Sequence, residues 1–326
     1  MKRLSRWFVQ LLSAVALLAA AGGHVAAQGY PTGPIRMIVP FGAGGGVDTM
    51  ARILGQKLAE SIGKSIVIEN RGGANGNIGT GIAAKAPKDG YTLLLTGAGF
   101  VTNPSLYSKV PFNPVKDFDP ISLLALAPNI LVVHPSVPAK SVAQLVSLAK
   151  ARPGEVHYGS AGSGSTPHLA AELFEALAKV DLLHVPYKGS GSALTGLLGG
   201  EVSIMFVAAL PVVPHITAGR LRALAVTSAS RLPATPELPT IAESGLKGYE
   251  SSQWYGVLAP AGTPDDILHL LNSHIVKIMQ NPEIKQRMTD SGSLAVGSTR
   301  QEFAAHIRTE IVKWAKVIKE SGARVD

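Results

Sequence analysis

The sequence predicts an α/β protein of two lobes with a ligand cleft between them. Short apolar segments alternate with amphipathic ones through most of the chain, which is typical of βαβ units and a largely parallel sheet. A length of 326 residues is enough for two packed cores. Two glycine-rich segments, 39–48 and 158–174, each join an expected strand to an expected helix. Ligands in such folds bind at the carboxyl ends of strands, so these two segments indicate the cleft.

Residues 1–27 have the pattern of a secretory signal peptide. Three cationic residues precede the apolar run 11–21, and small residues lead to a cleavage point near Ala27. We therefore expect an exported, soluble protein that begins near Gln28, and an uncleaved anchor is the alternative. The chain contains no Cys, which excludes disulfides, thiol catalysis and cysteine-ligated metals.

The first lobe is expected over residues 28–128 together with 254–326. Residues 35–41 form an apolar run suited to a buried strand, and residues 49–63 have helical apolar spacing that ends at the stop residue Gly63. The same alternation predicts a strand at 65–70, a helix at 76–86 and a strand at 91–96.

The second lobe is expected over residues 129–253, and its limits follow from the strands expected near 128 and 254. Its predicted strands are 130–135, 155–160, 182–187, 202–207 and 221–228. Its predicted helices are 141–152 and 166–180, with short helices between the last three strands. The Pro-rich stretch 231–240 is predicted as a surface connection.

Two strong helices are predicted in the final segment, where they return to pack on the first lobe. The first runs from Pro264 to about Gln280. The second begins at a capping box, in which Glu302 follows Thr299 by three positions, and it reaches Gly322.

The two glycine-rich segments suit an anionic ligand. Backbone N–H groups at a helix N-terminus lack partners and carry partial positive charge, and Gly and Ala let a ligand approach them closely. Such a position favours a phosphate or a carboxylate, and two loops can hold both ends of a small dianion. A tight turn after a buried strand is the alternative for either loop alone.

The charge of the chain fits small anions better than nucleic acid. The formal net charge is +8, and Lys2, Arg3 and Arg6 supply +3 of it, which leaves +5 after the signal peptide. No dense run of Lys and Arg is present, so we expect no nucleic-acid partner.

Motifs for other functions are incomplete. Val47 stands where a dinucleotide fingerprint needs its last Gly, and Leu58 stands where a phosphate loop needs its first. No Ser within 159–165 has a Gly two residues before it and another two residues after it, so the nucleophile elbow is absent. The nine His residues form no short metal-ligand spacing. We therefore expect no enzyme, no catalytic residue, no metal and no cofactor.

A series of stretches in the mature sequence points to one known family. They are "YPTGPIRMIVPFGAGGGVDTMARILGQKL", "IENRGGANGNIGT", "DGYTLLL", "NPSLY", "GSAGSGSTPHLAAELF", "HVPYKGSGSALTGLLGGEV", "PHITAGRLRALAVTS" and "PTIAESGLKGYE". Through them the chain resembles the solute receptors of tripartite tricarboxylate transporters, also called Bug or TctC-like receptors, and the resemblance covers essentially the whole mature chain in order. It implies a periplasmic Venus-flytrap binding protein, type II-like, which delivers a small organic anion to a two-subunit membrane permease.

The resemblance also implies the ligand-binding residues, because the ligand loops of the family coincide with the two glycine-rich segments. Backbone N–H groups and ordered waters typically hold the carboxylates in this family. Asn103 and Tyr187 match positions that commonly lie near the cleft. The loop residues that match are Phe41, Gly42, Ala43, Gly44, Gly45, Gly46 and Asp48 in the first segment, and Ser160, Ala161, Gly162, Ser163, Gly164, Ser165 and His168 in the second.

One stretch departs from the family pattern. Relatives usually carry acidic residues in a "VDLMFD"-like form, whereas this sequence has "VSIMFVAAL", with Ser203 and Val207 at those places. If Val207 faces the cleft, the pocket is less suited to an ammonium group. This favours a dicarboxylate, an aromatic acid or a similar amine-free anion over an amino acid.

Two alternative functions remain open from the sequence. One is an exported serine hydrolase that uses Ser163 or Ser165 with His168, although no third group or oxyanion elbow is evident. The other is a ligand sensor whose closed form docks on a membrane histidine kinase, a role that the family resemblance permits alongside transport.

Overall fold

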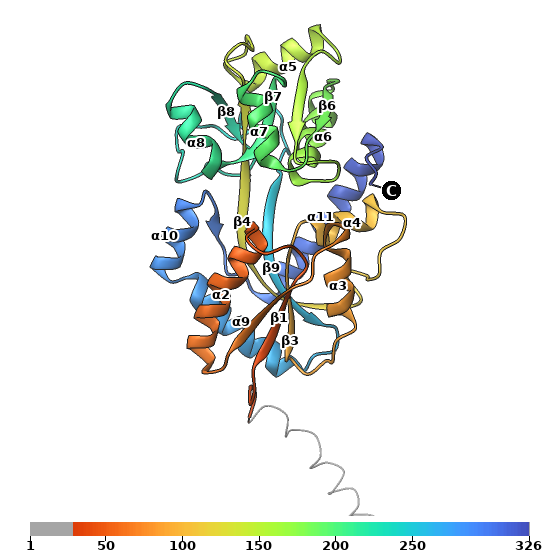
Figure 1. Ribbon diagram of the computed structural model, residues 1–326, viewed down its shortest axis with the longest axis vertical. Coiled ribbons are helices and arrows are strands. Elements are labelled where there is room, and N and C mark those ends of the chain that lie inside the picture. Colours follow the sequence, from red (N-terminus) through yellow and green to blue (C-terminus); the bar gives the residue numbers. More distant parts are fainter. Residues whose placement is uncertain (1–28, 326) are drawn as a thin grey trace, which may run out of the picture.

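The protein has two α/β lobes joined by long strands, as the sequence predicts (Figure 1). The computed structural model describes residues 29–325, so the predicted signal peptide lies outside the described residues. Strand β4 (Phe118–Val133) runs from one lobe into the other, and β9 (Ser252–Pro260) lies antiparallel beside its first half. Among residues 29–325, no helix is both long enough and apolar enough to cross a bilayer.

The first lobe is built on a mixed sheet in the order β2-β1-β3-β9-β4, with β10 beside β4. Strands β1, β2 and β3 are parallel, and β9 joins β3 in the antiparallel direction. Besides β4 and β9, the strands of this sheet are β1 (Ile35–Val39), β2 (Ile66–Asn70), β3 (Thr92–Gly97) and β10 (Leu294–Ala295). The helices are α2 (Gly46–Ile62), α3 (Asn77–Ala84), α4 (Gly99–Leu106), α9 (Asp265–Met279) and α10 (Pro282–Asp290), with the short 3₁₀ helix η1 (Ala74–Gly76) before α3.

The second lobe uses the far half of β4 as its central strand. There β4 pairs antiparallel with both β7 and β8, and β5 and β6 extend the sheet in parallel beyond β7. The strands are β5 (His157–Ser160), β6 (Leu183–Pro186), β7 (Ile204–Ala208) and β8 (Arg222–Val226). The helices are α5 (Val142–Ala151), α6 (Thr166–Ala178), α7 (Ser190–Leu198) and α8 (Ala209–Thr217).

The partners of β4 change between Pro128, which faces Ser252 on β9, and Asn129, which faces Ala208 on β7. A strand that belongs to two sheets gives a natural division at the point where its neighbours change. The predicted limits of the lobes, 28–128 with 254–326 and 129–253, remain a prediction that this change supports.

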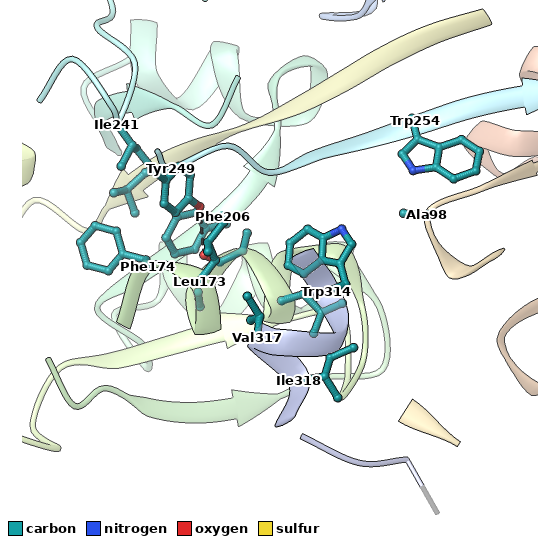
Figure 2. Close-up of a cluster of buried hydrophobic side chains, with 14 of the residues drawn as sticks. Ala98, Leu173, Phe174, Phe206, Ile241, Tyr249, Trp254, Trp314, Val317 and Ile318 are labelled. Carbon is teal, nitrogen blue, oxygen red and sulfur yellow. Dashed lines mark hydrogen bonds between the residues drawn. The ribbon is translucent and has the colours of Figure 1, made fainter. Parts of the chain in front are cut away.

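The last helix, α11 (Arg300–Ser321), packs on both lobes, whereas the sequence analysis assigned it to the first lobe alone. It lies against α4 of the first lobe and against α6 of the second. Figure 2 shows Trp314, Val317 and Ile318 of α11 in one buried apolar cluster with Leu173 and Phe174 of α6. Its apolar face is long enough to bury surface on both sides of the lobe junction. Helix α9 packs on α2 and β4, as expected.

Helix ends were the most predictable local features. Gly63 ends α2 in the left-handed conformation, with φ 69°, and the Thr299–Glu302 capping box begins α11 with both of its hydrogen bonds present. Local sequence patterns predict neither α4 nor α10, nor the first half of β4. Helix α4 has only eight residues and includes Pro104, so it lacks the apolar periodicity that identifies a longer helix.

Candidate functional site

A cavity between the lobes is the candidate functional site, and we call it the interlobe cavity. It has a volume of about 70 Å³, and residues of both lobes, of β9 and of α11 line it. Every lining residue in the described part of the chain is uncharged. They are Phe41, Asn75, Ala98, Gly99, Thr102, Gly164, Ser165, Thr166, Leu169, Gln253 and Trp314.

Two helix N-termini meet at this cavity. Helix α4 begins at Gly99 after Ala98, and α6 begins at Thr166 after its N-cap Ser165. The first N–H groups of a helix have no intrahelical partner and carry partial positive charge, so both helices direct donors to a shared space. Within the described residues, the N–H of Thr166 donates to no protein acceptor. This arrangement suits an anion with more than one oxygen.

Asp48 holds the first loop together and is not free to contact a ligand. It is 2% exposed, and its Oδ2 accepts from the Gly44 N–H at 2.8 Å and from Arg52 Nε at 2.9 Å. Its Oδ1 accepts from Asn70 Nδ2 at 2.9 Å and from Arg52 Nη2 at 3.0 Å. The bonds from Arg52, followed by those from Gly44 and Asn70, lower the pKa of Asp48 to about 2. An ionised, fully paired carboxylate fixes the loop conformation.

The structure divides the first loop between two surfaces. Phe41 lines the interlobe cavity, whereas Ala43, Gly44 and Asp48 line a separate exposed groove with Arg52. Gly42 and Gly45 are exposed and line neither of them.

Gly46 is a position where any side chain would clash with Tyr255. A Cβ there would lie 2.5 Å from the Tyr255 hydroxyl oxygen on β9, closer than any van der Waals contact. The ring of Tyr255 therefore sets how near the N-terminus of α2 comes to β9. The sequence predicts this glycine as a point of ligand approach, and the structure gives it a packing requirement as well.

Asn103 does not line the cavity, but it hydrogen-bonds to a residue that does. It is 1% exposed on α4, and its Nδ2 donates to the Asn75 carbonyl at 2.9 Å and to Asn77 Oδ1 at 2.8 Å. In return, Asn75 Nδ2 donates to Asn103 Oδ1 at 2.8 Å. These bonds hold Asn75 in the left-handed conformation, φ 50°, where it lines the cavity. The residue predicted from the family is thus the support, and its partner Asn75 lines the cavity.

The second loop is shaped by side chains beneath it. Ser160 is fully buried, and its Oγ accepts from the Gly162 N–H at 3.1 Å and lies 2.6 Å from His184 Nε2. His168 is 5% exposed, and its Nδ1 accepts from the Gly164 N–H at 3.0 Å. Gly164 and Ser165 line the cavity, whereas Ser160, Ala161, Gly162, Ser163 and His168 do not.

A stack of side-chain rings in the second lobe holds this loop in place. The His168 and His184 ring centroids lie 4.1 Å apart, and His168 Nε2 lies 3.1 Å from Glu172 Oε1, which also accepts from the Tyr158 hydroxyl at 2.8 Å. Burial, followed by the nearby His168, lowers the pKa of His184 to about 4. A neutral His184 can remain buried against the loop without an unpaired charge.

Tyr187 and Val207 lie away from the cavity. The Tyr187 hydroxyl donates to Glu201 Oε2 at 3.0 Å, and a Cβ at Gly196 would lie 2.3 Å from that hydroxyl oxygen, so the ring packs on α7. Val207 is 1% exposed and belongs to a core cluster of the second lobe with Met205. Neither residue lines the interlobe cavity.

Several residues at the cavity escaped the sequence analysis. Ala98 and Gly99 follow β3 with the same small-residue pattern as the two recognised loops, so this signal was available. Leu169 lies on a predicted helix, but the direction of its side chain depends on how α6 meets β9, whereas the sequence already indicates the Thr166 hydroxyl as a donor of the second loop. Gln253 and Trp314 come from distant segments and carry no local signal.

The arrangement gives no support to hydrolysis by Ser163 or Ser165 with His168. The Ser165 hydroxyl accepts from the His168 backbone N–H at 3.4 Å, and both ring nitrogens of His168 have other partners. No side-chain bond joins His168 to either serine in the described region. Residues 29–325 also contain no group of three or more His, Cys, Asp or Glu that could hold a metal.

Comparisons with known proteins agree on one family. The family model described as the tripartite tricarboxylate transporter family receptor matches residues 50–323. Protein BugT of Bordetella pertussis is 39% identical over 321 residues, which is 97% of this chain and 98% of BugT.

Two solved structures show the same fold. The structure of Rpa4515 from R. palustris with adipate is 39% identical, with a TM-score of 0.78, and the match covers 91% of this chain and all of that one. The structure of the periplasmic binding protein BugD is 35% identical, with a TM-score of 0.74, and the match covers 90% of this chain and 99% of BugD.

Proposed function

This chain belongs to the tripartite tricarboxylate transporter receptor family, and on that premise we propose that it is a periplasmic receptor for a small carboxylate. The observation that carries the proposal is the interlobe cavity, where two helix N-termini and several neutral donors converge without any charged side chain. Such a site binds anions through main-chain and hydroxyl donors. Each hydrogen bond to a charged group contributes about 1.5–3 kcal/mol.

The ligand we propose is an amine-free di- or aromatic carboxylate. An amino acid needs a carboxylate partner for its ammonium group, and no residue that lines the cavity in the described chain supplies one. Phe41, Leu169 and Trp314 offer apolar surface between the polar groups. A similar protein, Rpa4515, is seen with adipate, which has two carboxylates on an apolar chain.

We further propose delivery of this ligand to a two-subunit membrane permease, and residence in the periplasm. Membership of the receptor family supports the first proposal. The predicted signal peptide and the likeness to the periplasmic protein BugD support the second.

Calorimetry with the purified protein tests the ligand class. The panel contains adipate and other di- and tricarboxylates, aromatic acids, and amino acids of matched size. We expect at least one amine-free acid to bind with a Kd of about 100 µM or lower, and its amino analogue to bind at least about tenfold more weakly. If only amino acids bind, or if nothing in the panel binds, the proposed ligand class is wrong.

A further inference from the structure

Gln253 occupies the point where both lobes and the cavity meet. It lies on β9 at the lobe junction, and its side chain lines the interlobe cavity. Its Oε1 accepts from the Ala98 N–H of the first lobe at 3.3 Å and from the Thr166 hydroxyl of the second lobe at 3.2 Å. One carbonyl oxygen therefore links the N-termini of α4 and α6.

The orientation of the amide follows from its partners. A backbone N–H can only donate, so the atom that faces Ala98 must be the oxygen, and the Nε2 group must face the other way. Within the described residues, no protein acceptor pairs with Nε2. Two N–H donors on the cavity wall are thus left for another acceptor.

Gly97 makes room for this amide. A Cβ at residue 97 would lie 2.5 Å from Gln253 Nε2 and 2.8 Å from the Trp254 carbonyl oxygen. Even a methyl group there would displace the side chain, so the backbone of β3 is shaped to accept the carboxamide against it. This close fit holds Nε2 in one place relative to both helix N-termini.

We propose that Gln253 couples ligand recognition to closure of the lobes, and this inference rests on the proposed carboxylate ligand. Oε1 holds Ala98 and Thr166 together, while Nε2 donates to an oxygen of the bound acid. The ligand then completes the hydrogen bonding of a residue that already connects both lobes. A ligand that binds to this residue stabilises the closed arrangement through its differential affinity for that state.

Three variants separate the two roles. Gln253→Glu keeps an oxygen facing Ala98 and Thr166 but loses the Nε2 donors and places a negative charge in the cavity. Thr166→Val removes only the hydroxyl that links the second lobe. Gln253→Leu removes both roles. Gln301→Glu, at an exposed position on α11, is the control for the change in net charge.

Calorimetry with adipate, or with the tightest acid of the panel, measures the donor role. We expect Gln253→Glu and Gln253→Leu to weaken binding at least about tenfold, because both lose the charge-assisted hydrogen bond from Nε2 to the ligand. Thr166→Val keeps that bond and should weaken binding less than about fivefold. Gln301→Glu should bind as the unchanged protein does. Unchanged affinity in either Gln253 variant, with the fold intact by circular dichroism, would overturn the donor role.

Small-angle scattering without ligand measures the linking role, and it does not depend on the proposed function. Gln253→Leu and Thr166→Val should show a larger radius of gyration than Gln253→Glu and Gln301→Glu. Equal radii in all four variants would overturn the link between lobes. If the unchanged protein binds no acid while the radii differ as expected, the proposed function fails and the link stands.

Discussion

At the scale of single residues, the groups that shape the cavity differ from the groups that line it. Asp48, Asn103 and His168 were predicted from the family as ligand residues, and each is at most 5% exposed and bonded to a nearby loop. Their polar atoms are used to fix loop backbones, which lets neighbouring N–H groups keep one direction. A preorganised donor costs less to align when the ligand arrives.

Glu175 gives a residue-scale prediction about pH. Its side chain accepts from the Leu182 N–H at 2.7 Å, and burial, with Glu172 and Asp181 nearby, raises its pKa to about 8. Because this pKa is raised above the unfolded value, the stability that neutral Glu175 provides is complete below about pH 4.5. It is lost as the pH rises towards about 8.

We therefore expect Glu175→Gln to be more stable than the unchanged protein at pH 8, by on the order of 2 kcal/mol, since one pKa unit is worth about 1.4 kcal/mol and partial exposure screens the effect. The gain should be small near pH 5. Thermal unfolding at both pH values measures it, with Glu155→Gln as the exposed control. An equal gain in stability at pH 5 and pH 8 would contradict the conclusion that Glu175 is protonated in the folded protein.

At the scale of elements, the site is made from strand-to-helix connections with small residues. The loops after β1, β3 and β5 each lead into a helix, and they supply Phe41, Ala98 with Gly99, and Gly164 with Ser165 to the cavity. The donors come from the starts of α4 and α6. The loop before α2 contributes Phe41, and none of its glycines lines the cavity.

Gly46 gives the element-scale prediction, because its missing Cβ lets α2 approach Tyr255. Gly46→Ala should reduce the free energy of unfolding by about 1–3 kcal/mol, the usual cost of overpacking. Gly42→Ala is the matched control, since a Cβ there meets nothing within 4 Å. Chemical denaturation of both variants measures the difference.

A second substitution identifies the clash itself. Tyr255→Phe removes the hydroxyl oxygen that lies 2.5 Å from the added Cβ. It should therefore recover part of the stability that Gly46→Ala loses. If the double variant is no more stable than Gly46→Ala alone, the hydroxyl is not the source of the cost.

At the scale of the whole molecule, the lobes are connected by more than a flexible linker. Strand β4 takes part in both sheets, β9 runs beside it, and α11 packs on α4 and α6 across the junction (Figure 1). We therefore predict that closure is a small rotation about continuous strands, with α11 keeping apolar contact on both sides. Proteins that close in this way pack their lobes around the ligand.

Ligand addition should compact the protein in solution. On saturation with adipate, or with the tightest acid of the panel, we expect the radius of gyration to fall by on the order of 1 Å, as for a hinge closure. Small-angle scattering measures this change, with sodium chloride at matched ionic strength as the control. An unchanged radius at saturation would contradict closure by the ligand.

The sequence by itself determined the α/β class, most of the strands and helices, the family, and the two loops that begin α2 and α6. These follow from local patterns, namely apolar periodicity, helix caps and glycine after a strand, which act within a few residues. Only the tertiary structure decided which way each predicted site residue faces. Asp48 and Val207 show this, since one is turned into its own loop and the other into a core.

The tertiary structure also decided which residues line the cavity. Gln253 and Trp314 reach it because β9 and α11 cross the junction between the lobes, and Asn75 reaches it because Asn103 holds it there. Contacts between segments far apart in the chain depend on how whole elements pack, and packing leaves no signature in a short stretch of sequence.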